Sequence, residues 1–257
     1  MAASPTEPPR TAIVAGGGRA VGLAIALALA GEGMAVAVAD VDLDRAAEVV
    51  AAVEAAGGSA RTVLLDITDY DAVRSGFAAI EADLGPVDVL VINAGMPTER
   101  LESPFLESTP DHWKPFIEIN LYGSIHCARA VLPGMCERGW GRVVQISSGA
   151  AARGLPPSVG YAALGAAKAA SEGLVRHLAI EVADRGVTVN ALSLGQMTSA
   201  ADHAEPEVIA MVRANTPVGR PGEPEEAAAA VLWLASEQAG FVTGQVIHLN
   251  GGSYQGR

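Results

Sequence analysis

Residues 11–22 read Thr-Ala-Ile-Val-Ala-Gly-Gly-Gly-Arg-Ala-Val-Gly, a short apolar run that leads into a glycine-rich loop. The apolar run predicts a buried strand over residues 11–15, and the residues from Val21 onward have the period of a helix. Glycines between a strand and a helix allow a tight turn and let main-chain N–H groups approach a pyrophosphate at the helix N-terminus. Such a loop is a weak signal alone, but its place between a strand and a helix strengthens it. The stretch therefore predicts a nucleotide-binding site.

A single carboxylate indicates which dinucleotide such a site prefers. Asp40 ends the second apolar run, 18 residues after Gly22, where it can accept hydrogen bonds from an adenosine ribose. Its charge would repel a 2′-phosphate, whereas Arg19 in the loop could attract one. A carboxylate placed at the ribose should outweigh a flexible arginine, so we expect NAD(H) rather than NADP(H).

The rest of the chain alternates short β-rich runs with Ala-rich stretches of helical period. We expect strands at residues 11–15, 35–39, 61–65, 87–92, 142–146, 187–192 and 245–249. We expect helices at residues 21–30, 43–56, 69–84, 112–137, 161–184 and 223–235, with Asp42 and Thr68 as N-caps. This alternation predicts one α/β domain over residues 11–257, a doubly wound parallel seven-stranded sheet with helices on both faces.

Two segments fall outside the alternation. Residues 1–10 contain three prolines and one glutamate and are expected to form a disordered tail. Residues 194–222 lack a clear strand and contain several prolines and glycines. A stretch of that length is more often functional than accidental, so we expect it to cover the substrate, with a short helix over residues 206–214.

Composition narrows the class of protein. The formal charge of −12 and the pI of about 4.8 make nucleic acid and anionic membrane surfaces poor partners. Cys127 and Cys136 lie in one predicted helix, which suits neither a disulfide nor a zinc site, and the five histidines share no metal-ligand spacing. We therefore expect no metal site. Because no apolar run of membrane-spanning length or signal-peptide type occurs, we expect a cytoplasmic protein.

Further motifs stand at the expected ends of strands and on the expected helices. They are Asp66-Ile67 after the third strand, Asn93-Ala94-Gly95 after the fourth, Asn120 on the following helix, Ser147-Ser148 at the end of the fifth strand, Tyr161 and Lys168 on the next helix, and Asn250-Gly251-Gly252 after the last strand. Together with the glycine loop, this set resembles the short-chain dehydrogenase/reductase family along essentially the whole chain after residue 10. The motifs taken together are far more specific than the loop alone.

The resemblance implies a Rossmann-type fold, a nicotinamide cofactor and oxidoreductase activity. It assigns the catalytic roles to Asn120, Ser148, Tyr161 and Lys168. It implies cofactor contacts from Gly16, Gly18, Arg19, Ala20, Val21, Gly22, Asp40, Asp66, Ile67, Asn93, Ala94, Gly95, Tyr161, Lys168 and Gly195. It also suggests a homotetramer or homodimer packed through the helices at residues 112–137 and 161–184.

The chain departs from the family pattern in the glycine loop and after the sixth strand. Ala20 stands where the family usually has a glycine, and its methyl group is expected to weaken cofactor binding slightly. Leu194-Gly195 replaces the usual Pro-Gly after the sixth strand, which leaves the following loop less rigid.

A third departure concerns the catalytic pair. Tyr161 and Lys168 are seven residues apart, whereas most of the family uses a spacing of four, a position that Leu164 occupies here. Both offsets face nearly the same side of a helix, but the longer one moves the phenol about 4.5 Å along the axis. Lys168 can still approach the cofactor ribose and lower the phenol pKa. A looped-out turn around Leu164-Gly165 would restore the usual placement.

The register leaves the reaction open. The seven-residue spacing is similar to that of enoyl-acyl-carrier-protein reductases, whereas the 13 residues from Ser148 to Tyr161 are the interval of carbonyl reductases. We expect first an enzyme that moves hydride between NAD(H) and a small carbonyl or alcohol substrate. Tyr161 would transfer the proton, Lys168 hold the ribose, Ser148 orient the substrate oxygen and Asn120 anchor a water. Reduction of the C=C bond of an enoyl thioester comes second, and a catalytically silent NAD-binding scaffold subunit third.

Overall fold

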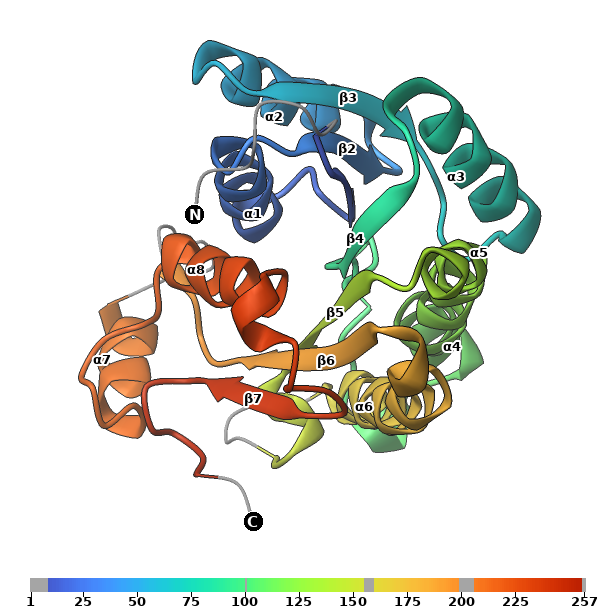
Figure 1. Ribbon diagram of the computed structural model, residues 1–257. Coiled ribbons are helices and arrows are strands. Elements are labelled where there is room, and N and C mark those ends of the chain that lie inside the picture. The colour runs from blue at the N-terminus through green and yellow to red at the C-terminus, as the bar shows by residue number, and fades with distance from the viewer. Residues whose placement is uncertain (1–8, 100, 155–159, 199–205, 256–257) are drawn as a thin grey trace.

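Seven parallel strands lie side by side in the order β3-β2-β1-β4-β5-β6-β7 (Figure 1). The computed structural model describes residues 9–99, 101–154, 160–198 and 206–255. The strands are β1 (Thr11–Ala15), β2 (Ala35–Asp40), β3 (Ser59–Leu64), β4 (Val87–Ile92), β5 (Gly141–Ser148), β6 (Val187–Leu194) and β7 (Val246–Leu249). The order reverses between β1 and β4, and in a doubly wound sheet ligands bind outside the carboxyl ends of the strands at that point.

Helices cover both faces of this sheet. They are α1 (Ala20–Gly31), α2 (Leu43–Ala55), α3 (Tyr70–Leu84), α4 (Pro110–Ile117), α5 (Gly123–Arg138), α6 (Ala162–Val182), α7 (Pro206–Asn215) and α8 (Pro224–Leu234). One core lies between the sheet and α1, α2 and α8, and the other between the sheet and α3, α5 and α6. The predicted fold class, with helices on both faces of a parallel sheet, is confirmed.

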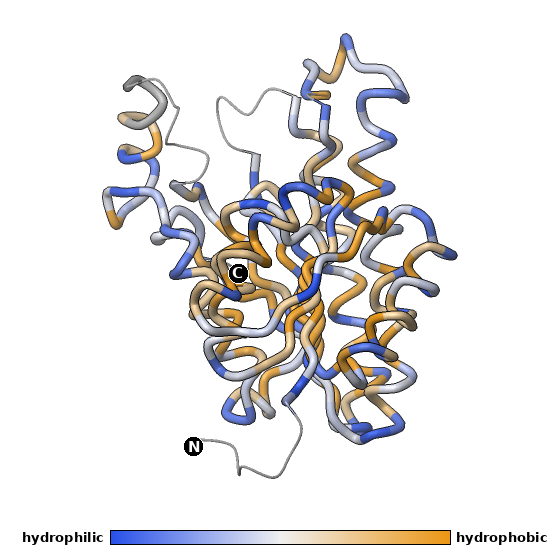
Figure 2. The backbone as a smooth tube through the Cα atoms, turned by 90° about the horizontal axis from the view of Figure 1, so that it is seen from above, coloured by the Kyte–Doolittle hydropathy of each residue, from blue (hydrophilic) through white to orange (hydrophobic). Residues whose placement is uncertain are grey.

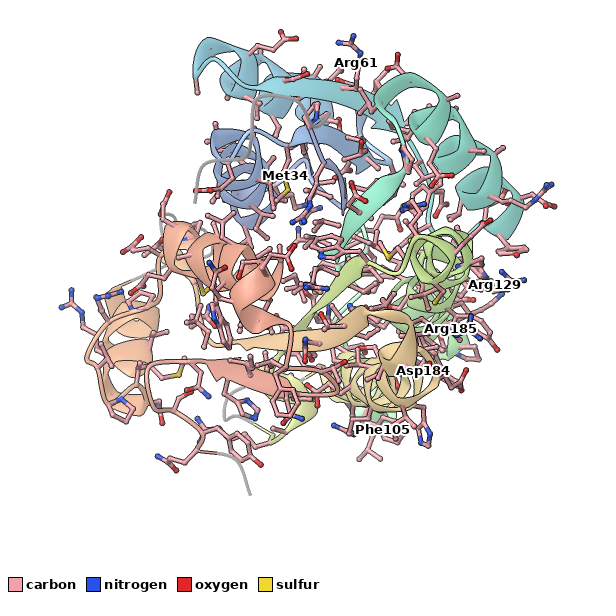
Figure 3. The ribbon with its side chains drawn as sticks, viewed as in Figure 1. Met34, Arg61, Phe105, Arg129, Asp184 and Arg185 are labelled. Carbon is pink, nitrogen blue, oxygen red and sulfur yellow. The ribbon has the colours of Figure 1, made fainter. Side chains whose placement is uncertain are left out.

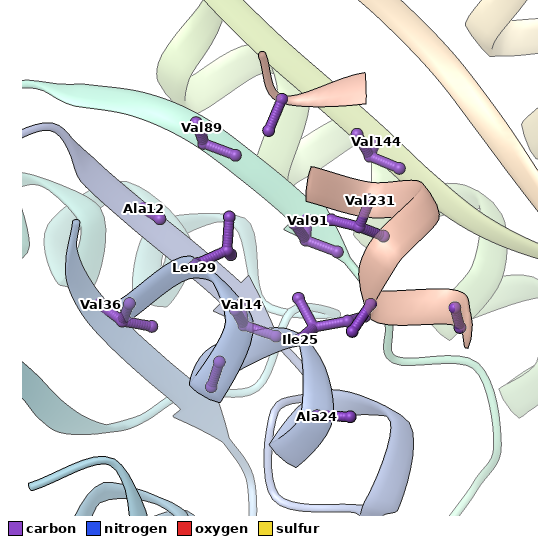
Figure 4. Packing of buried hydrophobic residues seen from close by; sticks show 14 of the residues in the cluster. Ala12, Val14, Ala24, Ile25, Leu29, Val36, Val89, Val91, Val144 and Val231 are labelled. Carbon is purple, nitrogen blue, oxygen red and sulfur yellow. The ribbon is translucent and has the colours of Figure 1, made fainter. Parts of the chain in front are cut away.

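Burial explains why these segments form these elements. The central strands are apolar on both faces because helices cover both, and Figure 2 shows the hydrophobic residues concentrated along them. Helix α1 is apolar on all sides because it lies between the sheet and α8 (Figure 4). Ile25 and Leu29 of α1 are fully buried there, and each side chain contributes about 1.5–3 kcal/mol of burial free energy.

The edge strand β3 carries a charged side chain that protects it from pairing with another sheet. Arg61 projects outward from it (Figure 3) and pairs with Asp83 of α3 at 3.2 Å. A charged side chain on an edge strand discourages pairing with another sheet. Among the described residues, no helix is long and apolar enough to cross a membrane.

One expected helix is in fact two. The segment predicted as a continuous helix over residues 112–137 contains α4, a π-helical turn at Glu118–Tyr122 and then α5. The side-chain amide of Asn120, inside the turn, donates to the carbonyl oxygens of Phe116 and Gly95, both at 2.9 Å. The second bond ties the turn to the loop after β4, which explains why the helix is widened at this point.

Three smaller expectations are also corrected. Thr68 is not the N-cap of α3, because Asp69 accepts the hydrogen bond from the Ala72 amide at 3.0 Å. The looped-out turn at Leu164-Gly165 does not occur, since the Gly165 amide donates regularly to the Tyr161 carbonyl at 2.8 Å. Arg10, assigned to the tail, lies 3.8 Å from the centre of the Trp140 ring and pairs with Glu237.

Other predictions about local structure are confirmed or lie outside the described residues. Asp42 caps α2, as predicted, by accepting a hydrogen bond from the Arg45 amide. The short helix predicted at residues 206–214 is α7. Residues 1–8 of the predicted tail and residues 199–205 of the predicted substrate-covering segment lie outside the described residues.

Candidate active site

The glycine loop after β1 is fixed to both neighbouring strands. Gly16 has a φ of +79° and donates its N–H to the carbonyl of Ala39 at 2.7 Å. The side-chain amide of Asn93 donates to the Gly16 carbonyl at 2.6 Å. A side chain at position 16 would overlap the backbone of Ala94. Glycine is therefore required here both for its conformation and for the close approach.

The first turn of α1 meets the same loop. A Cβ atom at Gly22 would lie 2.6 Å from the carbonyl oxygen of Gly17, so the helix packs directly on the loop backbone. Arg19 is the N-cap of α1, and its side chain makes no capping hydrogen bond. The first-turn N–H groups are thus left for a ligand, which is the arrangement that binds phosphates at helix N-termini.

Asp40 is held rigidly beside this helix terminus. One carboxylate oxygen accepts from the Gly18 amide at 2.9 Å and the other from the Asp42 amide at 3.1 Å. Arg45 is paired with Asp42 at 3.0 Å. The carboxylate of Asp40 therefore keeps one orientation at the end of β2, where the sequence predicts the adenosine ribose.

A cavity of about 770 Å³ runs from Asp40 across the carboxyl ends of the strands. Ten of the predicted site residues line it, namely Gly16, Arg19, Asp40, Asp66, Ile67, Asn93, Ala94, Gly95, Ser148 and Lys168. Asp66 is fixed by accepting two hydrogen bonds from Thr68, one from its amide and one from its hydroxyl group. The cavity is long enough to join the predicted adenosine end to the predicted catalytic end.

Lys168 forms the base of the catalytic end. Its side chain is only 5% exposed and its Nζ donates to the Ile146 carbonyl at 2.7 Å. Burial lowers the pKa of Lys168 to about 8, although the negative charge of Glu172 acts in the opposite direction. A Cβ atom at Gly95 would lie 2.7 Å from Nζ, so the glycine leaves room for the amine.

Asn120 lies beside the same glycine as Lys168. Its Oδ1 is buried and has no hydrogen-bond partner among the described residues, while its amide nitrogen is fully engaged. An unsatisfied buried acceptor costs about 1–3 kcal/mol, so a hydrogen-bond donor at this position would be stabilising. That Oδ1 lies 3.0 Å from the Cβ position of Gly95, beside Lys168 Nζ. The arrangement fits the water that the sequence assigns to Asn120.

The serine and the tyrosine differ in their relation to the cavity. Ser148 lines it at the end of β5, where its Oγ also accepts from the Ala150 amide at 3.2 Å. Tyr161 is the N-cap of α6, half-buried, and is not among the lining residues that the structure describes. Leu164, one turn further along the helix, lines the cavity, as Ser148 and Lys168 do. The position that lines the cavity one turn before Lys168 is therefore held by Leu164, and Tyr161 precedes it by three residues.

Several predicted residues support the cavity without lining it. They are Gly18, Ala20, Val21, Gly22, Asn120, Tyr161 and Gly195. Gly195 donates to the Leu249 carbonyl at 2.8 Å and packs against Asn250.

Other lining residues were not predicted. They are Val41, Asp42, Arg45, Leu65, Thr68, Met96, Pro97, Thr98, Glu99, Leu101, Pro115, Glu118, Ile119 and Leu164. The lining residues from Met96 to Glu99 and Leu101 belong to the loop that begins with the Asn93-Ala94-Gly95 motif. Because they directly follow a predicted cofactor motif, they could have been predicted from the sequence.

Comparison with known proteins agrees with this geometry. A family model described as Enoyl-(Acyl carrier protein) reductase matches residues 16–254. The acetoacetyl-CoA reductase of Rhizobium meliloti (strain 1021) is 41% identical over 247 residues, which cover 95% of this chain and 98% of the relative. The chain belongs to the short-chain dehydrogenase/reductase family. It is accordingly an oxidoreductase of the short-chain dehydrogenase/reductase type, and the family resemblance seen in the sequence is confirmed.

Two solved structures of this family show the range of cofactors. A 3-oxoacyl-[acyl-carrier protein] reductase from Brucella melitensis with bound NAD is 32% identical, has a TM-score of 0.87 and covers 98% of this chain and 94% of its own. A gluconate 5-dehydrogenase from Burkholderia cenocepacia J2315 in complex with NADP and tartrate is 29% identical, has a TM-score of 0.86 and covers 96% of each chain. The fold therefore accepts either dinucleotide, and the residues at the ribose must decide between them.

Proposed function

We propose that this short-chain dehydrogenase/reductase is an NAD(H)-dependent reductase of a small carbonyl compound, with short β-ketoacyl thioesters as the substrate class. The observation that carries the proposal is one continuous cavity with the fixed carboxylate of Asp40 at one end and Lys168 and Ser148 at the other. The similarity to an acetoacetyl-CoA reductase supports the substrate class. The carboxylate supports NAD(H), because it can accept from ribose hydroxyl groups and repels a phosphate in their place.

The residues at the catalytic end can perform the steps that a carbonyl reduction needs. The bound nicotinamide supplies the hydride. Ser148 donates a hydrogen bond to the substrate oxygen, where negative charge develops as the carbonyl is reduced. With a dinucleotide bound, Lys168 would donate to the ribose hydroxyl groups from its buried position. Tyr161 gives the proton to the oxygen, and the free Oδ1 of Asn120 holds a water that returns protons from solvent.

The position of Tyr161 sets a condition on this mechanism. Tyr161 is not among the cavity-lining residues that the structure describes, whereas Leu164, three residues later on the same helix, lines the cavity and is only 6% exposed. A leucine at that point excludes water from the reacting atoms, and exclusion of water strengthens the electrostatic effect of Ser148 and Lys168.

Reduction of an enoyl thioester is the second candidate, and the same register favours it. In that reaction charge develops on a carbonyl oxygen several bonds from the carbon that receives hydride. A proton donor displaced along the helix, such as Tyr161 relative to Leu164, would suit an oxygen that is displaced in the same way.

One experiment separates these functions. NADH consumption is followed with acetoacetyl-CoA and with crotonyl-CoA, and the proposal expects turnover of the first. Turnover of crotonyl-CoA alone establishes the enoyl reductase. If neither substrate is reduced, no hydroxyacyl thioester is oxidised in reverse, and NADH still binds, the chain is a silent cofactor-binding subunit.

Association of copies through α5 and α6 is part of the proposal. Tyr122, at the end of the π-helical turn, and Ile125, near the start of α5, are exposed side chains, and exposed apolar groups favour a contact between subunits. Light scattering of the purified chain measures the oligomeric state. A dimer or tetramer is expected, and a monomer at micromolar concentration contradicts this part of the proposal.

A further inference from the structure

A second buried charge stands one helical turn beyond Lys168. Glu172 of α6 is only 7% exposed, and the hydroxyl group of Ser147 donates to its Oε1 at 2.6 Å. The preceding residue of β5, Ile146, provides the carbonyl that accepts from Lys168. Two consecutive residues of one strand thus hold a buried cation and a buried carboxylate of one helix. Nothing in the reaction described above uses this carboxylate.

The two charges are close enough to act on each other. Residues four apart on a helix have Cβ atoms about 5–6 Å apart, and both side chains turn toward β5. A buried carboxylate without a counter-charge is strongly destabilising, and so is a buried ammonium group. The burial of Lys168 lowers its pKa, and Glu172 is the group whose charge raises it. The charge of Glu172 therefore offsets part of the cost of burying the Lys168 amine.

Other charges around Lys168 are farther away or already engaged. Glu118 lines the cavity and pairs with Lys114 at 3.5 Å, and Tyr161 stands at the start of α6. Strand β6 has no charged side chain. His248 of β7 lies beyond Ser193, the strand partner of Ser147.

Arg176, four residues after Glu172 on α6, is exposed, and two other cationic side chains point elsewhere. Arg142 stands at the opposite end of β5 and bonds the Ser236 carbonyl, while Arg129 of α5 projects to the outside (Figure 3). Glu172 is therefore the one buried carboxylate beside Lys168 among the described residues.

We infer that Glu172 is a positioning residue that keeps Lys168 in its ammonium form at the cofactor ribose, with Ser147 orienting the carboxylate. The role at the ribose rests on the proposed function, whereas the effect on the charge of Lys168 does not require a cofactor. Glu172 touches neither substrate nor cofactor and acts through Lys168 alone. A neutral residue at position 172 leaves the amine to lose its proton at a lower pH.

The composition of the chain makes a direct test available. It contains only two lysines, Lys114 and Lys168, so protein labelled with ¹³C at lysine Cε gives two NMR signals, and Lys168→Arg assigns them. Titration of the cofactor-free protein then yields the ionisation midpoint of each amine. In Glu172→Gln we expect the Lys168 midpoint to fall by about one pH unit, a tenfold change in its protonation constant. The Lys114 signal serves as an internal reference and stays unchanged.

A matched control and a second variant complete this test. Glu181→Gln removes the same charge from an exposed position of the same helix and should leave the Lys168 midpoint where it is. Ser147→Ala keeps the carboxylate of Glu172 but removes the hydrogen bond that orients it, and should lower the Lys168 midpoint by a smaller step. This variant keeps the test possible if Glu172→Gln does not fold. An unchanged midpoint in every folded variant overturns the inference.

Cofactor binding gives the functional readout. The dissociation constant of NADH is measured by fluorescence at about pH 6 and pH 8. If the midpoint falls by one unit, Glu172→Gln binds NADH about fivefold more weakly than wild type at pH 8 and equally well at pH 6. Equal weakening at both pH values indicates a merely structural role and contradicts the inference. If wild type does not bind NADH at all, the proposed function fails while the NMR result stands by itself.

Discussion

Replacing Asp40 with asparagine should move cofactor preference from NADH toward NADPH. The carboxylate is held by the amides of Gly18 and Asp42 at 2.9 and 3.1 Å, so its charge is fixed where a ribose substituent would lie. Asparagine has nearly the same shape and no charge. The change therefore removes the repulsion of a 2′-phosphate, while the amide oxygen of asparagine can still accept one of the two backbone hydrogen bonds.

The size of the shift follows from simple electrostatics. A carboxylate about 5 Å from a phosphate of charge near −2, at an effective dielectric constant of about 40–80, gives a repulsion of about 2–3 kcal/mol. Loss of a charged hydrogen bond to the ribose weakens NADH binding by a further 1.5–3 kcal/mol or so. Together these two contributions should change the ratio of the dissociation constants for NADPH and NADH by at least about 300-fold.

Fluorescence titration of both dinucleotides measures this ratio without a substrate. Asp44→Asn is the matched control, because Asp44 is an exposed carboxylate in the first turn of α2 and does not line the cavity. It should leave the ratio within about twofold of wild type, since an exposed charge outside the cavity is screened by solvent. If Asp40→Asn also leaves the ratio unchanged, the carboxylate does not select the cofactor and the argument for NAD(H) is refuted.

Three further predictions test other parts of the site. Tyr161→Phe should lower kcat by about 10²–10⁴-fold without changing the NADH dissociation constant. Adding Leu164→Tyr to this variant should restore part of the rate. Wild-type turnover in the single variant would show that Tyr161 is not the proton donor. Gly22→Ala places a methyl group 2.6 Å from the Gly17 carbonyl oxygen. It should lower the free energy of unfolding in urea by about 1–3 kcal/mol and should weaken NADH binding. An unaltered unfolding midpoint disproves the close packing. The pKa of Lys168 is about 8 in the folded chain against 10.5 for an ordinary lysine. Between these pH values the unfolded chain binds more protons than the folded chain, so the free energy of unfolding should rise by about 1 kcal/mol from pH 8 to 9. Lys168→Met should lose that rise in denaturant midpoint, and an equal rise in both proteins refutes the assignment.

The sheet and its order of elements could be predicted because local and global signals agree. Residues 35–40 alternate alanine and valine without a polar residue until Asp40, which only a strand buried on both faces requires. The break between α4 and α5 could not be predicted, because the apolar spacing continues through it. It depends on the bond from Asn120 to the Gly95 carbonyl, 25 residues away in the chain.

The candidate site shows the same division. Gly16, Asp40 and Lys168 were found because each has a chemistry that its position at a strand end or on a helix makes recognisable. Glu172 was not found, since a glutamate four residues after a lysine on a helix is usually an exposed ion pair. Its burial depends on Ser147 from another element, and contacts of this kind have no signature in the sequence.

Transfer of a labelled hydride tests the central claim most directly. The purified chain is incubated with acetoacetyl-CoA and NADH that carries deuterium at both C4 positions, and the thioester product is weighed by mass spectrometry. The account predicts a hydroxybutyryl thioester that has gained one deuterium at the carbon of the former ketone. If NADH binds to the protein and no deuterium appears in any reduced thioester, the claim that hydride passes from NADH to a substrate carbonyl bound beside Lys168 and Ser148 is contradicted.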